Sequence, residues 1–124
     1  MFDTPQIMRL AQGMARHAAA RQGVIAENIA HADTPGYRAR DVEPFAATLD
    51  RGLAATRPGH IQPASQARSF TPIPDSTAPA VSPNGNTVSL EREMMRAARN
   101  KQAHDMALAV YGSARAIWRA SLGR

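Results

Sequence analysis

Apolar and small side chains recur along the first thirty residues in steps of four and three. They are Ile7, Ala11, Met14, Ala18, Ile25, Ile29 and Ala32, with one break at residues 21–22. Such spacing places these side chains on one face of an α-helix. Thr4 followed by Pro5 is typical of a helix start, because proline at the first helical position loses no hydrogen bond. The pattern predicts a helix over residues 4–32.

A second series with the same spacing occupies the last third of the chain. Its positions hold Leu90, Met94, Ala97, Lys101, His104, Leu108, Tyr111, Arg115, Trp118 and Leu122, and a neighbouring stripe holds Ala103, Met106, Val110, Ala114 and Ile117. A seven-residue repeat is typical of helices that wind around one another. Two stripes on one helix require contacts on more than one side. This pattern predicts a helix over residues 90–122, with Ser89 as its cap.

The segment over residues 41–87 has a different composition. It holds seven of the nine prolines, with Ser, Thr, Gly and Asn between them. Prolines at this density exclude a long helix and a central strand. We therefore divide the chain into an N-terminal helix with its turn (1–36), a Pro-rich extended arm (37–87) and a C-terminal helix (88–124). The expected fold is mainly α, a coiled-coil-like hairpin of two long helices joined by a mostly irregular arm.

A single helical hairpin leaves part of this apolar surface uncovered. It buries one face of each helix, and a core that small contributes little stability. Assembly of many copies side by side would bury the remainder, and head-to-tail contacts that do not close into a ring give a filament or tube. We expect the residues of this assembly stripe to pack against one another within one chain or between neighbours. They are Ile7, Met14, Ile25, Ile29, Leu90, Met94, Leu108, Tyr111, Ile117, Trp118 and Leu122.

The sequence contains no pattern typical of a catalytic or metal site. There is no cysteine, and the four histidines lack the spacing of a metal-binding motif. There is also no glycine-rich phosphate loop and no nucleophile elbow. We therefore expect no enzyme activity, catalytic residue, metal, cofactor or small-molecule substrate. No apolar run is long enough to span a membrane, and the first residues do not form a conventional secretory signal.

The formal net charge is +5, and all but one of the fifteen basic residues are arginine. A basic chain can bind nucleic acid, an anionic membrane surface or an acidic protein. The arginines are scattered along the chain without a continuous run, so charge alone identifies no partner. An Arg-rich helical hairpin that binds nucleic acid is the alternative from a different class. It would bind duplex DNA tightly and with a steep dependence on salt.

The first helix must end abruptly at Asp33-Thr34-Pro35-Gly36. Pro35 disfavours the helical conformation at Thr34, and Pro-Gly supplies the central pair of a type II turn, with Gly36 at positive φ. Tyr37 then leaves the turn at a fixed angle. A second turn, Asn84-Gly85-Asn86, leads into the last helix.

The stretch around this turn closely resembles the signature of flagellar basal-body rod and hook proteins, A-N-N-I-A-N-x-x-T-P-G-Y. The matching residues are Ala26, Asn28, Ile29, Ala30, Thr34, Pro35, Gly36 and Tyr37. Asp33, before the turn, is similar to the proximal rod members of the family, as are residues 39–42 and 88–94. Glu27 and His31 depart from the signature, since the family usually has Asn at both positions.

The resemblance implies a structural subunit of the proximal rod of the bacterial flagellum. Family members self-assemble into an axial drive shaft that transmits torque for motility, with the two terminal helices in its inner layer. The implied partners are the chain itself, other rod proteins, the MS ring with its small rod-junction adaptor, and the flagellar type III export apparatus. The implied location is the basal body on the periplasmic side of the inner membrane, reached without a cleaved signal peptide.

A shorter resemblance concerns export. Phe45 and Leu49 have the spacing of the motif by which rod and hook subunits dock at the export gate. Packing of two apolar side chains one helical turn apart explains the same pattern equally well. Two further alternatives remain open within this reading: another proximal rod subunit of the same family, and a soluble adaptor for export that stays in the cytoplasm.

Overall fold

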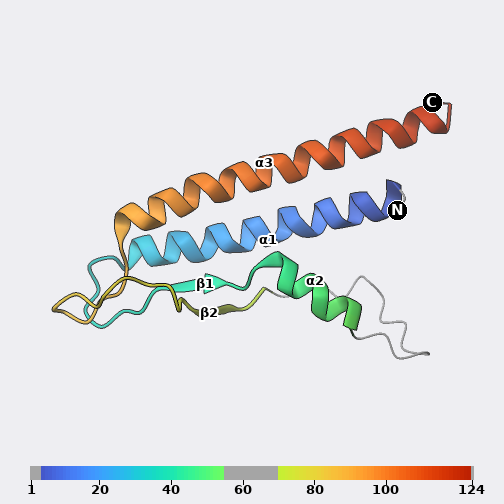
Figure 1. Ribbon diagram of the computed structural model, residues 1–124. Coiled ribbons are helices and arrows are strands. Elements are labelled where there is room, and N and C mark those ends of the chain that lie inside the picture. Colours follow the sequence, from blue (N-terminus) through green and yellow to red (C-terminus); the bar gives the residue numbers. More distant parts are fainter. Residues whose placement is uncertain (1–3, 55–69, 124) are drawn as a thin grey trace.

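The computed structural model describes residues 4–54 and 70–123. Its elements are α1 (Thr4–Ala30), β1 (Arg40–Val42), α2 (Phe45–Ala54), β2 (Pro72–Pro74) and α3 (Leu90–Ser121). The helices α1 and α3 run antiparallel beside each other as a long hairpin, and both chain ends lie at its open end (Figure 1). β1, β2 and α2 lie beside α1 on the side away from α3 in this view. The predicted mainly helical hairpin is confirmed.

The helix α1 ends two residues earlier than the predicted Ala32. After Ala30 the chain tightens into a turn, in which the amides of Ala32 and Thr34 donate to carbonyls three residues earlier, each at 3.1 Å. The prediction was too long because a small residue such as Ala32 fits the apolar period without being helical. The boundary therefore lies before Pro35, as expected, but leaves room for a complete turn.

The helix α3 begins where the sequence predicted, although its cap is different. Ser89 occupies the N-cap position, but its side chain makes no capping hydrogen bond. Its carbonyl oxygen instead accepts the first helical hydrogen bond, from the amide of Glu93 at 3.0 Å. Glu91 and Glu93 lie in the first turn, where the helix dipole favours negative charge.

The contact between α1 and α3 is built mainly from small side chains. The buried apolar residues of the two helices are Ala11, Ala18, Val24, Ile25, Ala107 and Ala114. Asn100 is also buried, and its amide donates to the Ala18 carbonyl at 2.7 Å and to Gln22 Oε1 at 3.1 Å. Because alanine projects so little from the helix, the two backbones can approach closely enough for this side chain to bridge them.

The arm contains more regular structure than its composition predicts. β1 and β2 pair antiparallel, with Asp41 opposite Ile73, and α2 follows Pro44 directly. Both strands are short, and β2 has proline on either side of Ile73, which fits the expectation that no central strand forms. The rest of the predicted irregular arm, residues 55–69, lies outside the described residues.

Candidate assembly site

The turn after α1 has the predicted type II geometry. Gly36 has a φ of 74°, and the amide of Tyr37 donates to the Thr34 carbonyl at 3.3 Å. The turn is also fixed to the loop before α3, because the Gly36 amide donates to the Asn84 carbonyl at 2.9 Å. A Cβ atom added to Gly85 would lie 3.3 Å from the Gly36 Cα, so glycine permits this close approach. We call residues 31–37 and 82–87 together the hairpin tip.

Asn28 and Tyr37, two residues of the family signature, are joined by a hydrogen bond. Asn28 is completely buried. Its amide donates to the Arg40 carbonyl at 2.7 Å, and its Oδ1 accepts from the Arg40 amide at 3.1 Å and from the Tyr37 hydroxyl at 3.2 Å. Asn28 therefore pairs with Arg40 as a neighbouring strand would, and thereby fixes the start of β1 on α1.

Asn86 is a central residue that the sequence analysis did not single out. Its buried amide nitrogen lies 2.8 Å, 2.9 Å and 2.8 Å from the carbonyl oxygens of His31, Ala32 and Thr34, all near the end of α1. Its Oδ1 accepts from the amide of Val88 at 2.7 Å. One side chain thus joins the end of α1 to the segment that enters α3. The Asn84-Gly85-Asn86 turn was a signal for a bend, but not for this long-range contact.

The two departures from the family signature both have partners, one at the start of β1 and one in the hairpin tip. Glu27 forms an ion pair with Arg40, and the His31 ring stacks on Tyr37 with centroids 4.5 Å apart. His31 Nδ1 also lies 3.1 Å from the Thr34 hydroxyl. The Glu27 carboxylate therefore links α1 to the start of β1, and the His31 imidazole contacts other residues of the turn.

The other signature residues lie at or near the surface. Ala26, Ala30, Asp33, Thr34, Pro35 and Gly36 are exposed and Ile29 is half-buried. Within the described residues, the buried part of the motif is thus the framework around Asn28. Its exposed part lies on the last turns of α1, at Ala26 and Ala30, and on the hairpin tip, at residues 33–36.

A second group of residues, not predicted from the sequence, joins both long helices to the arm. Arg96 of α3 is 2.7 Å from Asp75, 3.4 Å from Glu93 and 3.8 Å from Asp41, measured between charged atoms. Arg21 of α1 makes a two-pronged contact with Asp41 at 2.9 Å and 3.0 Å. These contacts join α1, α3, β1 and Asp75, the residue that follows β2, and we call the group the arginine–carboxylate cluster.

Contacts in and beside this cluster favour the ionised form of the Asp75 carboxyl group. Burial alone would raise the pKa of the carboxyl group, but hydrogen bonds from Thr77 and the Arg96 guanidinium outweigh it and hold the pKa below the usual value. The ionised form is therefore favoured in the folded chain. Asp75 stabilises the fold above the pKa of its unfolded form, and this contribution is lost as the pH falls through the folded value.

Phe45 and Leu49 both lie on α2 and are half-buried. A Cβ atom added to Gly13 would lie 3.2 Å from the Phe45 ring, so the absence of a side chain there lets α2 approach α1. The His17 ring contacts Phe45 at 5.8 Å and Phe70 at 5.1 Å between centroids, and its Nε2 donates to the Glu43 carbonyl at 2.7 Å. The predicted one-turn spacing of Phe45 and Leu49 thus occurs on a helix packed against α1.

We expect His17 to make the stability of the fold depend on pH near neutrality. Burial, with a smaller effect of Arg21, lowers the pKa of His17, while Asp41 acts in the opposite sense. Between the folded pKa and the unfolded value of about 6.5 the unfolded chain binds more protons, so stability falls as the pH drops through this window. Urea unfolding at pH 7.5 and pH 5.5 should show this loss in the wild type but not in His17→Gln. An equal loss in both proteins would assign it to other groups.

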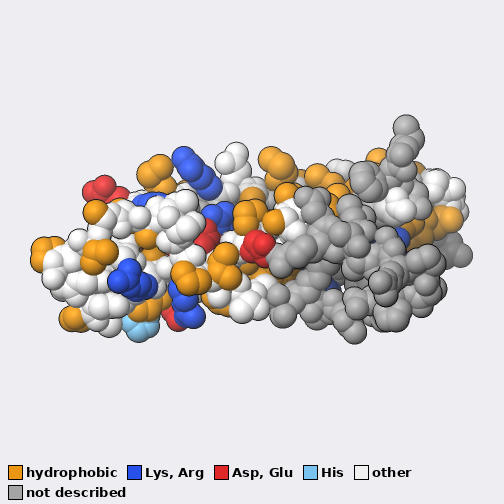
Figure 2. Space-filling view, turned by 60° about the horizontal axis from the view of Figure 1, so that its bottom comes forward, with side chains coloured by type: hydrophobic (Ala, Val, Ile, Leu, Met, Phe, Trp, Pro, Cys, Tyr) orange, Lys and Arg blue, Asp and Glu red, His pale blue; other side chains and the backbone are white. Residues whose placement is uncertain are grey.

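Most of the predicted assembly stripe remains uncovered in the single chain. The exposed members are Met14, Leu90, Met94, Leu108, Ile117, Trp118 and Leu122, with exposures between 37% and 64%. Ile25 is fully buried, and Ile7, Ile29 and Tyr111 are half-buried. Figure 2 shows another face of the molecule on which hydrophobic side chains likewise reach the surface, beside arginines and carboxylates.

The geometry of α3 explains this exposure. The buried positions Glu93, Asn100, Ala107 and Ala114 recur every seven residues. Positions 94, 101 and 108 of the predicted heptad series each come one residue after a buried position. Their side chains therefore lie about 100° further round the helix axis than the buried ones. The stripe therefore borders the contact with α1 rather than forming its centre.

The described residues contain neither a candidate metal site nor a membrane-spanning helix. They contain no group of three or more metal-ligating side chains that could hold a metal ion. None of their helices is both long and apolar enough to cross a membrane.

A helical hairpin with a fixed turn and large apolar side chains on its outer faces defines a subunit of a larger helical assembly. Comparison with known proteins specifies which one. The chain is 37% identical over 121 residues to the flagellar basal body rod protein FlgB of Escherichia coli, and the match covers 82% of this chain and 81% of that protein. The corresponding protein of Salmonella typhimurium is 35% identical over 118 residues, covering 86% and 85%.

A third relative gives a similar match. The FlgB protein of Agrobacterium fabrum is 32% identical over 108 residues, covering 82% of this chain and 81% of that protein. No family model matches the chain. The chain belongs to the FlgB family of flagellar basal body rod proteins, and it is a structural subunit of the rod.

Proposed function

We propose that the chain builds the proximal rod by packing the exposed part of its assembly stripe against copies of itself and against other rod proteins. The observation that carries this proposal is the set of large apolar side chains left uncovered on α3. Burial of such surface between subunits supplies the main favourable free energy of association. The product is a drive shaft whose joints are helix-to-helix contacts and which transmits torque for motility.

The proposal also includes the base of the rod and the route to it. The neighbours would be the MS ring with its small rod-junction adaptor, on the periplasmic side of the inner membrane. The chain would arrive through the flagellar type III export apparatus without a cleaved signal peptide, using Phe45 and Leu49 at the export gate. Because Phe45 packs against α1 at Gly13, this docking requires α2 to be detached from α1, as in a chain exported unfolded.

Lysine substitutions in the stripe should abolish assembly without unfolding the hairpin. Leu108 and Ile117 are 50% and 64% exposed, so Leu108→Lys and Ile117→Lys should leave the circular dichroism of the free chain unchanged. Burial of an unpaired ammonium group against a neighbour is strongly unfavourable. We therefore expect the amount of the variant in purified basal bodies to fall about tenfold or more, with loss of swimming in a strain that lacks the native copy.

The matched controls are Gln102→Lys and Ser113→Lys, which place the same charge at exposed polar positions of α3. These variants should enter basal bodies and support swimming. Equal loss in controls and test variants would show that added charge, not the stripe, is responsible. Cell fractionation tests the export route, since a chain confined to the cytoplasm of a swimming strain would contradict it. Neither the described residues nor the comparisons favour the nucleic-acid alternative.

A further inference from the structure

A groove runs between α1 and α3, and its lining comes from these two helices alone. Its deepest part has a volume of about 430 Å³ and is lined by Ala18, Ala19, Gln22, Ala97, Ala98, Asn100, Lys101 and His104. Ala18 and Asn100 form the buried floor, whereas Ala19, Ala98 and Lys101 are exposed at the rims. Small side chains on both walls allow a third helix to approach closely, because ridges of one helix pack into the grooves of others.

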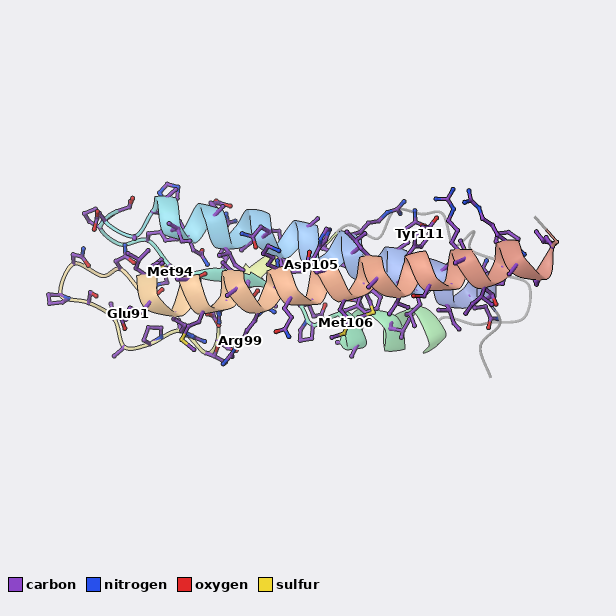
Figure 3. The ribbon with its side chains drawn as sticks, turned by 90° about the horizontal axis from the view of Figure 1, so that it is seen from above. Glu91, Met94, Arg99, Asp105, Met106 and Tyr111 are labelled. Atoms are coloured by element: carbon purple, nitrogen blue, oxygen red, sulfur yellow. The ribbon has the colours of Figure 1, made fainter. Side chains whose placement is uncertain are left out.

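Toward the open end of the hairpin, the side of α3 that lines this groove carries larger apolar and basic side chains. Leu108 and Arg115 follow Lys101 at intervals of seven residues, and Arg119 lies eighteen residues, or about five full turns, beyond it. These residues therefore share one side of α3. Figure 3 shows Asp105, the ion-pair partner of the groove residue Lys101, on the edge of α3 away from α2, together with Tyr111, and Met106 on the edge nearer to α2. The groove side of α3 is thus the side away from the arm.

The charge on this side is positive and largely uncompensated. Lys101 pairs with Asp105 at 2.7 Å, and Asp105 is the last acidic residue of α3. Arg115 and Arg119 are both exposed, and neither forms an ion pair with another described residue. Trp118 lies between them in the sequence, one helical turn after the buried Ala114 and so at the border of this side that faces α1, and it is 43% exposed. Arginine and tryptophan beside apolar groups are the residue types enriched where protein partners bind most strongly.

The two long helices of a second copy of the chain are poorly suited to this surface. The helix α1 contains one acidic residue, Glu27, which already pairs with Arg40. In α3, Glu93 is buried, and Asp105 is paired with Lys101. Glu91 is then the one exposed carboxylate of the two long helices without an ion pair among the described residues. Neither helix therefore offers two free carboxylates one turn apart.

We infer that the groove and the basic, apolar side of α3 bind an amphipathic helix of a different protein, which carries acidic residues beside its apolar stripe. The apolar stripe of that helix fills the alanine-lined groove and covers Leu108 and Trp118. Its carboxylates meet Arg115 and Arg119. This inference rests on the proposed function, because the partner is expected among the other components of the rod.

Trp118 provides a direct signal for such binding, because it is the only tryptophan of the chain. The probe is a synthetic amphipathic helix of fifteen residues with a leucine stripe flanked by glutamates and without tryptophan. Its titration into the full chain should shift Trp118 emission to shorter wavelength and weaken with added salt. Matched peptides with glutamine or lysine in place of glutamate should bind at least about threefold more weakly.

Paired variants test the charge directly. Arg115→Gln with Arg119→Gln should weaken binding of the acidic peptide by about three- to tenfold. Arg9→Gln with Arg16→Gln is the control, since Arg9 is nine residues before the buried Ala18 and lies about half a turn away from the α3 contact. The inference is overturned if the control pair loses as much affinity as the test pair. A larger emission shift with phosphatidylglycerol vesicles than with the acidic peptide would also overturn it, in favour of a membrane surface.

The assembled rod gives an independent measurement. The native chain has no cysteine, so Ala98→Cys can carry a benzophenone crosslinker at a single exposed rim position. Irradiation of purified basal bodies followed by peptide sequencing should identify an acidic helix of another rod protein. An adduct with a second copy of the chain would overturn the inference but leave the rod function intact. Absence of the chain from basal bodies would instead refute the proposed function.

Discussion

Arg96→Met is expected to lower the free energy of unfolding by about 3–5 kcal/mol, the range typical when one member of a buried charge group is removed. Arg96 contacts three carboxylates, and the side chains of Asp75 and Glu93 are exposed by only 5% and 2%. Methionine fills a similar volume but compensates none of the negative charge. The expected loss is therefore caused by the carboxylates that remain buried, not by a cavity.

Urea unfolding of the full chain, followed by circular dichroism, measures this loss. Arg99→Met is the matched control, because Arg99 is exposed on the same helix and forms no ion pair with another described residue. Its effect should stay within about 0.5 kcal/mol. If both variants were equally stable, the arginine–carboxylate cluster would not fasten the arm to the hairpin.

Asn28→Ala is expected to cost about 2–4 kcal/mol, since it removes several buried hydrogen bonds at once. The amide and the carbonyl of Arg40 both lose their partner on α1, and the Tyr37 hydroxyl loses its acceptor. The start of β1 should detach from α1. Faster hydrogen exchange at the Arg40 amide would report this detachment separately from global unfolding.

Tyr37→Phe distinguishes the hydrogen bond between Asn28 and Tyr37 from the two hydrogen bonds between Asn28 and the Arg40 backbone. It removes one hydrogen bond from the half-buried side chain, so the expected loss is about 0.5–1.5 kcal/mol with little change in exchange at Arg40. Gln102→Ala, at an exposed position of α3, serves as the neutral control. If Asn28→Ala were as stable as this control, the role assigned to the signature asparagine would be wrong.

Local patterns in the sequence were sufficient for the two long helices and for the turn between α1 and β1. The apolar period, the Thr4-Pro5 start and the Pro35-Gly36 pair each depend on neighbouring residues. Local rules also placed Ser89 at the start of α3. They failed at the end of α1, where Ala32 fits the apolar period but lies in the turn, with its carbonyl bonded to the distant Asn86.

The face by which α3 contacts α1 could not be predicted from hydrophobicity. Its buried positions include Glu93 and Asn100, two residue types that are normally exposed, together with alanines that carry little apolar signal. The residues with the strongest apolar signal, such as Leu108 and Ile117, lie outside the contact. Hydrophobicity alone assigns them to a core, whereas under the proposed function they contact neighbouring subunits.

The arginine–carboxylate cluster and the Asn86 contacts were missed for a different reason. They include contacts between residues more than fifty positions apart, such as Asp41 with Arg96 and His31 with Asn86. Scattered charged residues and a turn-forming asparagine have ordinary surface roles in most proteins. Only the three-dimensional arrangement shows that these residues face one another.

The small β-sheet of the arm affects how copies of this chain can associate at high concentration. Because Asp41 pairs with Ile73, the outer edge of β2 is formed by Pro72 and Pro74, which have no N–H groups to donate. The opposite edge, at Arg40, is already paired with the Asn28 side chain. The lack of these donors disfavours the addition of a further strand at either edge, which is the contact that seeds amyloid-like fibres.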